Sequence, residues 1–368
     1  MSLYSALARP VLFALDAERA HDLTIAALRL PGMPGILGIG RAAPDHRLTQ
    51  TVFGLTFQNP IGLAAGLDKQ GTAVKAWAAL GFGFAEIGTV TPRAQPGNDR
   101  PRLFRLRDDR AVINRFGFNS AGADAVGTNL AVSGAQHRRL GAGSSPFRIG
   151  INVGKNKETP NEAAVEDYLR AVDVLHSLAD YIVINVSSPN TAGLRALQER
   201  HALRPLVEQV IARVRAVAPH EIPVLVKVSP DLTDFDLLES VDAAAAGGAS
   251  GVIATNTTIS RDGVRFARDI AAESGGLSGA PLRDRADHVC RVLFRHLQGK
   301  LPIVGVGGIF TADEAYQRIR SGASLVQLYT GFLYEGPAMV SRMTRGLAAR
   351  VARDGFQSIA QAVGIDAD

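Results

Sequence analysis

The stretch "YIVINVSSPNT" (181–191) joins two kinds of sequence that together decide the fold. Its first six residues are apolar almost throughout rather than alternating, which indicates a strand buried on both faces, as in a parallel sheet. Small hydrogen-bonding side chains follow at once, where a simple turn back to a helix usually has Gly, Pro or Asp. The pattern predicts a buried strand whose C-terminal end holds something planar and polar.

Similar apolar runs recur along the chain and alternate with helical patterns. The other seven runs are 59–65, 84–90, 147–153, 223–228, 251–256, 302–308 and 325–330. Helices are expected at 71–81, 162–179, 195–218, 236–248 and 311–322, and Thr311 and Glu314 have the spacing of a capping box. This alternation predicts an α/β fold, namely a (β/α)8 TIM barrel with a short N-terminal helical extension. An open, doubly wound sheet is the alternative.

Composition narrows the classes of partner. The 368 residues carry a formal net charge of +5, but the basic residues are mostly Arg spread along helices, with no basic stripe interleaved with aromatics. We therefore expect no nucleic-acid partner, and anionic lipid or small anionic substrates suit the charge better. The one cysteine, Cys290, lies in a helical pattern and is expected to be buried. Because His residues are scattered and Cys is single, no metal site is expected.

The residues that follow the eight runs describe one site. In a TIM barrel, function sits where the strands end at the C-terminal face, so all eight endings meet in a single ring. The endings are "AGLDK" (65–69), "GTVTP" (88–92), "NVGKN" (152–156), "NVSSPN" (185–190), "KVSPD" (227–231), "ATNTT" (254–258), "GVGGI" (305–309) and "LYTG" (328–331).

The last two endings predict an anion cradle. Glycine amides in "GVGGI" precede the helix that begins at "TADEA" (311–315), and "YTG" follows the next strand. Free N–H groups near a helix N-terminus bind phosphate, and tight turns are the alternative reading of these glycines. Neither a GxxxxGK[ST] nor a GxGxxG motif is present, so ATP and Rossmann-bound NAD are not expected.

Lys227 interrupts the apolar run 223–228. A buried ammonium group is costly unless it is paired, so this lysine needs an electron-rich partner in the barrel mouth. The N1–C2=O edge of a flavin is one such partner, and a surface lysine on a frayed strand is the alternative.

Ten stretches of the chain can be compared with known families as a set. They are "AAGLDK" (64–69), "PRLFRL" (101–106), "INRFGFNS" (113–120), "INVGKNK" (151–157), "NVSSPNT" (185–191), "VKVSPD" (226–231), "ATNTT" (254–258), "GGLSG" (275–279), "GVGGI" (305–309) and "VQLYTG" (326–331). Taken together, these motifs resemble the quinone-dependent (class 2) dihydroorotate dehydrogenase family, flavin enzymes of pyrimidine synthesis. The resemblance spans nearly the whole chain in the right order, and "NVSSPN" with "INRFGFNS" is its most specific part.

The resemblance implies the residues of two binding sites. For FMN they are Ala65, Gly66, Lys69, Thr89, Asn152, Asn185, Lys227, Thr255, Gly279, Gly308, Tyr329 and Thr330. For dihydroorotate or orotate they are Lys69, Asn114, Arg115, Phe116, Gly117, Phe118, Asn185, Asn190, Asn256 and Thr257. Carboxamides suit the donors and acceptors of a cyclic imide, and Lys69 suits its carboxylate.

The resemblance also implies the chemistry. A hydride passes from C6 of (S)-dihydroorotate to N5 of FMN, and a base at the position of Ser188 takes the proton from C5. Thr191 relays this proton through a water, and Lys69 completes the catalytic set. A turn-forming hydroxyl before Pro189 is the alternative role of Ser188, and without the resemblance the choice between Ser187 and Ser188 is open.

A serine at position 188, rather than a cysteine, implies a membrane quinone as the final acceptor. Residues 1–40 are then an N-terminal helical membrane and quinone-access segment, and residues 41–368 are the FMN-binding catalytic barrel. Two short helices are expected, the first carrying Leu7 and Val11 on one face although Pro10 would end or kink it, the second capped by Asp16. The resemblance implies that His21, Arg105 and Tyr329 line the quinone path.

The implied location is the cytoplasmic face of the cell inner membrane, with peripheral attachment through residues 1–40. Neither expected helix is long enough to span a bilayer, and no cleaved signal peptide is expected. A cap over the barrel bottom without a membrane role is the alternative. If the segment serves only the quinone, its deletion leaves reduction by dihydroorotate intact.

Two other functions fit part of this pattern. A tRNA dihydrouridine synthase shares the flavin barrel and positive charge but depends on a cysteine in an active-site loop, whereas Cys290 lies in a helix. A barrel that serves only as a membrane-bound scaffold is expected to lack polar groups at its strand ends, yet all eight endings carry them. The segment 131–145 is expected to be a mobile surface loop.

Overall fold

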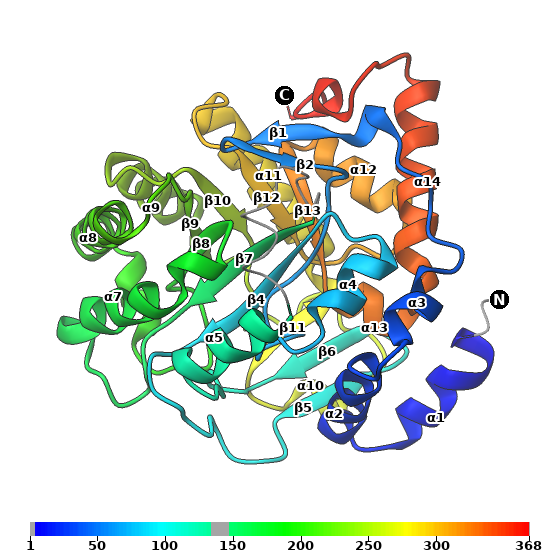
Figure 1. Ribbon diagram of the computed structural model, residues 1–368, viewed down its shortest axis with the longest axis horizontal. Coiled ribbons are helices and arrows are strands. Elements are labelled where there is room, and N and C mark those ends of the chain that lie inside the picture. The colour runs from blue at the N-terminus through cyan, green and yellow to red at the C-terminus, as the bar shows by residue number, and fades with distance from the viewer. Residues whose placement is uncertain (1–3, 134–146, 368) are drawn as a thin grey trace.

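The computed structural model describes residues 4–133 and 147–367, so most of the predicted mobile loop 131–145 lies outside the described residues. Eight parallel strands close into a barrel in sequence order, with the last strand paired to the first (Figure 1). They are β3 (Ile61–Leu63), β4 (Phe84–Val90), β7 (Arg148–Val153), β8 (Tyr181–Asn185), β9 (Val224–Val228), β10 (Gly251–Ala254), β12 (Ile303–Val306) and β13 (Ala323–Leu328). The TIM barrel is confirmed, and the open sheet is excluded.

Helices surround this barrel (Figure 1). Those between or after its strands are α4 (Val74–Leu80), α5 (Ala123–Val132), α7 (Ala164–Leu175), α8 (Arg200–Val217), α9 (Asp234–Ala246), α10 (Arg268–Ala271), α11 (Arg283–Leu297), α12 (Ala312–Arg320), α13 (Thr330–Glu335) and α14 (Ala338–Arg353). Short 3₁₀ turns occur at His46–Leu48, Asn161–Ala163, His176–Leu178, Leu194–Gln198, Ala280–Leu282 and Ile359–Ala362. The capping box of Thr311 and Glu314 starts α12, and Cys290 is fully buried in α11, as predicted.

A hairpin that the sequence reading missed closes the barrel bottom. Strands β1 (Gln50–Val52) and β2 (Leu55–Phe57) pair antiparallel, and Phe57 packs edge-to-face on Phe84 at the start of β4, with ring centroids 5.3 Å apart. Val52 and Phe57 join the apolar cluster that fills the lower barrel. The bottom is therefore capped by this hairpin, which removes that role from the N-terminal helices.

A second unpredicted sheet contributes to the opposite end. Strands β5 (Leu103–Leu106), β6 (Ala111–Asn114) and β11 (Gly276–Gly279) form an antiparallel sheet in the order β11-β6-β5. Strand β6 ends at Asn114, and β11 carries Ser278 and Gly279, so this sheet delivers side chains to the C-terminal mouth of the barrel.

The N-terminal segment folds as a π-helical turn (Tyr4–Ala8) followed by α1 (Arg9–Ala14), α2 (Ala17–Leu28) and an unpredicted α3 (Met33–Gly38). The predicted cap of α2 is confirmed, because the Asp16 carboxylate accepts a hydrogen bond from the Arg19 amide at 2.9 Å. Pro10 lies in the first turn of α1, where its missing N–H costs little. Within the described part of the chain, no helix is long and apolar enough to cross a membrane.

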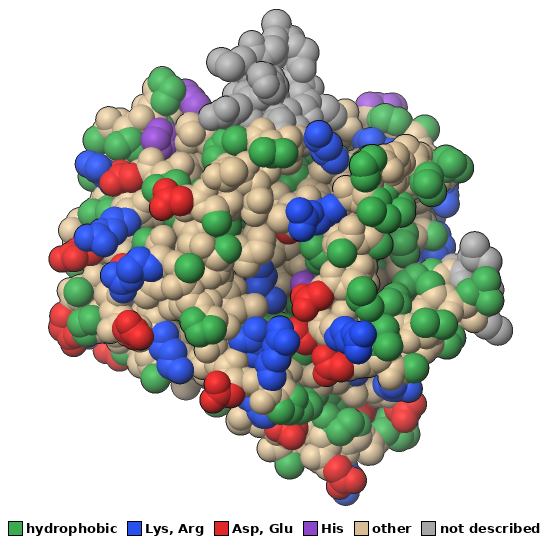
Figure 2. Space-filling model, turned by 60° about the horizontal axis from the view of Figure 1, so that its bottom comes forward, with side chains coloured by type: hydrophobic (Ala, Val, Ile, Leu, Met, Phe, Trp, Pro, Cys, Tyr) green, Lys and Arg blue, Asp and Glu red, His purple; other side chains and the backbone are tan. Residues whose placement is uncertain are grey.

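This segment nevertheless exposes many apolar side chains. Figure 2 shows hydrophobic side chains gathered on the right-hand part of the face that it presents. The large exposed hydrophobic residues of the segment are Leu7, Val11, Leu23, Leu30, Ile36 and Ile39.

Candidate active site

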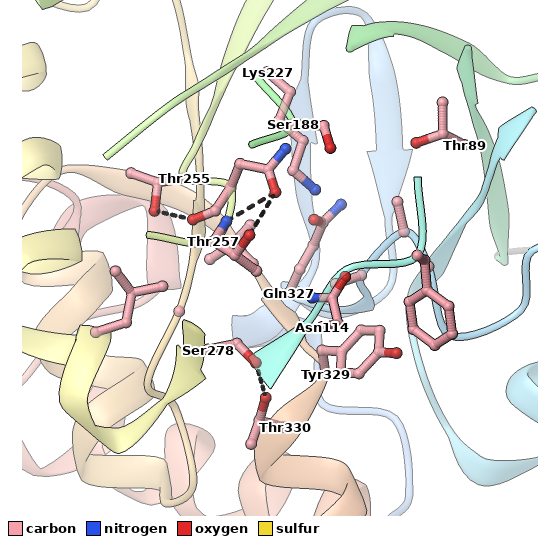
Figure 3. A pocket seen from close by; sticks show the side chains of 18 of the residues that line it. Thr89, Asn114, Ser188, Lys227, Thr255, Thr257, Ser278, Gln327, Tyr329 and Thr330 are labelled. Atoms are coloured by element: carbon pink, nitrogen blue, oxygen red, sulfur yellow. Dashed lines mark hydrogen bonds between the residues drawn. The ribbon is translucent and has the colours of Figure 1, made fainter. Parts of the chain in front are cut away.

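A cavity of about 1010 Å³, counted with its open mouth, occupies the C-terminal end of the barrel. Residues from seven of the eight predicted strand endings line it, together with Asn114 of β6 and Ser278 of β11. In Figure 3, Thr89, Ser188 and Lys227 surround the cavity, and Ser278 is hydrogen-bonded to Thr330 at one end. The predicted ring-shaped site is therefore present as one continuous pocket.

Below the cavity lies a carboxylate that the sequence reading missed. Glu86 on β4 is fully buried and accepts hydrogen bonds from Asn152 Nδ2 at 2.7 Å and from Gln327 Nε2 at 2.6 Å. Lys227 Nζ lies 3.8 Å from Glu86 Oε1 and is also buried. The buried lysine thus has a protein counter-charge, which rules out a frayed surface strand. A lone Glu in "FAEIGTV" was the only signal for this partner.

Asn152 acts from behind the pocket wall rather than in it. Its Oδ1 accepts hydrogen bonds from Thr89 Oγ1 at 2.5 Å and from Asn185 Nδ2 at 3.1 Å, while its amide group donates to Glu86. Thr89 and Asn185 line the cavity and Asn152 does not. Asn152 therefore orients two lining side chains from outside the lining.

The hydroxyl groups of the neighbouring serines differ in environment. Ser188 lines the cavity, and its Oγ accepts a hydrogen bond from the Asn190 amide at 3.2 Å. Ser187 Oγ lies outside the lining, where it accepts from Asn256 Nδ2 at 3.0 Å. Of these two serines, only Ser188 thus presents its hydroxyl to the cavity, although it also makes the turn expected before Pro189. Thr191 Oγ1 is buried and has no hydrogen-bond partner among the described residues.

Lys69 is partly buried at the rim, with its ammonium group 3.5 Å from the centroid of the Phe116 ring. Burial lowers the pKa of Lys69 to about 8, while the carboxylate of Glu18 on α2 acts in the opposite direction. A lysine in this state is positively charged at neutral pH and loses its charge in mildly alkaline solution.

At the far end of the cavity the backbone is bare. A Cβ on Gly308 would lie 2.6 Å from Arg283 Cα, and one on Gly279 would lie 2.3 Å from the Arg110 carbonyl oxygen; both glycines also have positive φ. The helix N-terminus predicted to face the anion is that of α12, and this prediction needs correction. The amides of Phe310 and Thr311 at the start of α12 already donate to Glu314 Oε2. The first turn of α13 lines the cavity instead.

A second cavity, of about 880 Å³ with its mouth, lies between the N-terminal helices and the barrel. Mostly apolar side chains line it, and Tyr329 lines both cavities. Burial lowers the pKa of His21 to about 3, so its imidazole is neutral. Arg105 donates from Nη1 to the Leu12 carbonyl at 2.9 Å and lies over the Phe13 ring. His21, Arg105 and Tyr329 are therefore brought together, as predicted.

Comparison with known proteins assigns this architecture. The family model described as dihydroorotate dehydrogenase matches residues 47–351. The chain belongs to the dihydroorotate dehydrogenase family. It is 52% identical over 360 residues to the dihydroorotate dehydrogenase (quinone) of Anaeromyxobacter dehalogenans (strain 2CP-C), covering 97% of this chain and 96% of that protein. With the Deinococcus deserti enzyme of the same name, identity is 49% over 373 residues, covering 99% and 100%.

Solved structures agree. The crystal structure of the dihydroorotate dehydrogenase of Eimeria tenella in complex with ferulenol superposes with a TM-score of 0.85 at 36% identity, covering 95% of each chain. Its ligand-free form gives the same TM-score and covers 95% of this chain and 99% of that one. The fold and the family are thus supported by independent comparisons.

Dihydroorotate dehydrogenases of this class use FMN, and the residues of this chain fit that cofactor. Gly279 and Gly308 line the cavity without side chains, so a phosphate could approach their backbone closely. Gln327 Oε1 is buried without a hydrogen-bond partner among the described residues, and Lys227 lies nearby in the same wall. A planar heterocycle with donors and acceptors on its edge satisfies both groups.

Most residues that the resemblance implied for this dihydroorotate dehydrogenase line the first cavity. They are Ala65, Gly66, Lys69, Thr89, Asn114, Phe116, Gly117, Phe118, Asn185, Ser188, Asn190, Lys227, Thr255, Asn256, Thr257, Gly279, Gly308, Tyr329 and Thr330. Asn152 and Thr191 lie behind it. Arg115 is turned away, with Nη1 2.5 Å from Glu273 Oε2, so its side chain does not face the cavity. The sequence reading missed Ser278 and Gln327 as site residues, although they lie in "GGLSG" (275–279) and "VQLYTG" (326–331), which carry the resemblance.

Proposed function

We propose that this pocket is where the chain, as a quinone-dependent dihydroorotate dehydrogenase, oxidises (S)-dihydroorotate to orotate in de novo UMP biosynthesis. The observation that carries the residue assignments is the convergence of the Ser188 hydroxyl, the ammonium groups of Lys69 and Lys227 and linked carboxamides on a single cavity. When bound, FMN supplies the acceptor for the hydride from C6 at its N5.

The substrate grip follows from hydrogen bonds among the lining residues. Asn190 Nδ2 donates to Asn114 Oδ1 at 3.2 Å, and Asn256 Nδ2 donates to Ser187 Oγ, so these carboxamides are held in fixed orientations. Fixed donors and acceptors match the imide edge of dihydroorotate, with Thr257, Asn185 and the backbone at Gly117 and Phe118 completing the site. The Lys69 ammonium, beside the ring of Phe116, pairs with the carboxylate of the substrate.

Ser188 takes the proton from C5 of the substrate. The hydrogen bond that its Oγ accepts from the Asn190 amide favours negative charge on that oxygen as its own proton leaves. That proton needs an acceptor in a dry site, and Thr191 Oγ1 lies buried with an unused hydrogen-bonding capacity three residues further on. Relay through Thr191 and a water is the path we assign.

We assign the flavin ring of FMN to one end of this pocket and its phosphate to the other. Lys227 and Gln327 face the ring, backed by Glu86, whereas Thr89 and Asn185 are oriented by Asn152. Ala65, Gly66 and Thr255 form the wall beside it, and Gly279, Gly308 and Thr330 hold the phosphate, with Tyr329 between the two cavities.

The second cavity is the proposed quinone path, because it is apolar and reaches Tyr329 from the N-terminal helices. We assign residues 1–40 to quinone access and residues 41–368 to the catalytic barrel. The exposed Leu7, Val11, Ile36 and Ile39 suit peripheral attachment to a membrane surface, which we place at the cytoplasmic face of the inner membrane.

The acceptor is testable in one assay. With dihydroorotate as donor and a long-chain quinone, fumarate or NAD offered in parallel, only the quinone is expected to sustain turnover. Steady-state orotate formation measures this directly. Turnover with fumarate or NAD at the rate of the quinone reaction would contradict the assignment.

Gly308→Val is expected to abolish FMN binding, because its Cβ would lie against the backbone of Arg283 and φ is +71°. Flavin absorbance per protein after purification measures occupancy, and circular dichroism reports folding. Gly35→Ala is the matched control, since a Cβ there meets nothing within 4 Å and flavin content should be unchanged. A Gly308→Val protein with full flavin content would contradict the assignment of the FMN phosphate to Gly308.

Orotate affinity is expected to depend on pH through Lys69. The ammonium form binds the carboxylate, so affinity is constant below the pKa and falls as pH rises through about 8. This alkaline limb, the fall of orotate affinity at high pH, is measured by titrating the flavin absorbance with orotate from about pH 6 to about pH 10. In Lys69→Met the limb should vanish and affinity should be low at every pH, whereas an unaltered limb would assign it to another group.

A further inference from the structure

We propose that Glu18 of α2 is a positioning residue for the dihydroorotate site: through Arg102 it holds the loop 95–98 against the pocket wall. The inference rests on the function proposed above. It makes the quinone-access segment part of the architecture of the substrate site.

The first link is a buried ion pair between the N-terminal segment and the barrel chain. Arg102 Nε lies 3.2 and 3.1 Å from the two carboxylate oxygens of Glu18, and Nη2 lies 2.8 Å from Oε1. Both side chains are buried. Arg100 also reaches Glu18 at 3.0 Å, but its side chain is 66% exposed. Loss of one partner from a buried pair leaves the other charge uncompensated, so Glu18 constrains Arg102 strongly.

The second link uses the remaining arm of the same guanidinium. Arg102 Nη1 donates to the carbonyl oxygens of Pro96 at 2.6 Å and Asn98 at 2.8 Å. One planar fork therefore joins a carboxylate of α2 to two carbonyls of the loop 95–98. A lysine has a single nitrogen and cannot reproduce this geometry.

The third link joins that loop to the substrate wall. The Asn98 amide donates to the Phe116 carbonyl at 2.9 Å, and Asn98 Nδ2 donates to the Asn190 carbonyl at 3.2 Å. The Asn98 side chain also fits against Gly117, where a Cβ would lie 2.6 Å from it. Phe116, Gly117 and Asn190 line the cavity, so a shift of Arg102 displaces two of its walls.

The effect of Glu18 on the charge of Lys69 also supports a positioning role for Glu18. Glu18 and Asp22 favour its ammonium form, Arg102 opposes it, and the neighbouring His21 is neutral. Glu18 is the stronger of the two favourable groups. Removing its charge therefore lowers the pKa of the lysine that receives the substrate carboxylate.

This chain of contacts revises the expectation that residues 1–40 can be deleted without affecting reduction by dihydroorotate. Deletion removes Glu18 and leaves Arg102 without its carboxylate partner. We expect the truncated protein to lose substrate affinity as well as quinone turnover.

The test uses the full-length FMN-loaded protein in five variants: Glu18→Gln, Arg102→Lys, the double variant of these two, Arg100→Ala and Asn98→Ala. Orotate affinity is read from the flavin absorbance, alongside flavin content and the rate of flavin reduction by dihydroorotate. Glu18→Gln is expected to retain FMN, to bind orotate roughly 10- to 100-fold more weakly, and to shift the alkaline limb to lower pH. Because both residues act in one chain, the double variant should be no weaker than Arg102→Lys. Arg100→Ala should match the wild type.

Unchanged orotate affinity and reduction in Glu18→Gln, with only quinone turnover altered, would overturn the proposal. Additive losses in the double variant would do the same. Asn98→Ala leaves the ion pair intact and should reproduce the loss of affinity, so wild-type binding in this variant also counts against the proposal even where Glu18→Gln fails to fold. A wild-type protein that dihydroorotate does not reduce would instead reject the function itself.

Discussion

The Ser188→Ala protein is expected to keep its FMN and to bind orotate. The rate at which dihydroorotate reduces its flavin should fall by about 10²–10⁴-fold at neutral pH. The cavity, its carboxamides and Lys69 do not depend on the hydroxyl, so binding survives. The proton at C5, however, loses the oxygen that the Asn190 amide polarises. Rapid-mixing measurement of flavin bleaching under anaerobic conditions gives the rate directly.

Ser187→Ala is the matched comparison, because this neighbouring hydroxyl bonds to Asn256 and does not line the cavity. A loss smaller than that of Ser188→Ala is expected there, from looser positioning of Asn256. Equal rates for Ser188→Ala and the wild type would place the base elsewhere, and a larger loss in Ser187→Ala would exchange the roles of the two serines.

Thr24→Trp is expected to separate the two half-reactions. Thr24 lines the second cavity from α2, so an indole there fills the space beside His21 and Ile25. Reduction of the flavin by dihydroorotate should remain near the wild-type rate. Reoxidation by a long-chain quinone should fall by roughly 10²-fold, since the acceptor can no longer approach Tyr329 closely.

Stopped-flow reoxidation of the reduced protein with quinone in detergent measures the second step alone. Leu23→Trp is the control, because Leu23 is the preceding residue of α2, is 49% exposed and does not line the cavity. Quinone reoxidation that is unaffected by Thr24→Trp would place the quinone path outside this cavity.

Much of the barrel could be read in advance. The predicted run 84–90 coincides with β4, and the other seven runs each contain the core of a barrel strand. Parallel strands are covered on both faces and therefore consist of consecutive apolar residues, which can be recognised in the sequence. The strands β5, β6 and β11 lie outside the barrel in an antiparallel sheet and were missed, although residues 111–113 of β6 are also consecutive, buried and apolar.

The location of the site could also be predicted from the sequence, but the contacts of its individual side chains could not. Polar residues after each strand had to converge because the strands are parallel and the barrel closes. Which way each side chain points depends on local backbone and neighbours: Arg115 turns to Glu273, and Asn152 stands behind Thr89. The choice between Ser187 and Ser188 came from the family resemblance, and the cavity lining agrees with it.

The amino-acid order alone therefore predicted the eight barrel strands and the ring of strand endings, since these follow from burial patterns a few residues long. The tertiary structure decided that the sheet closes into a barrel and is not open. Pairing between distant groups needed the folded chain. Glu86 lies opposite Lys227, and Glu18 meets Arg102 across 84 positions, only because barrel closure and the packing of α2 bring them together. Charges buried at such separations leave no periodic trace, because each depends on a partner that local sequence does not specify.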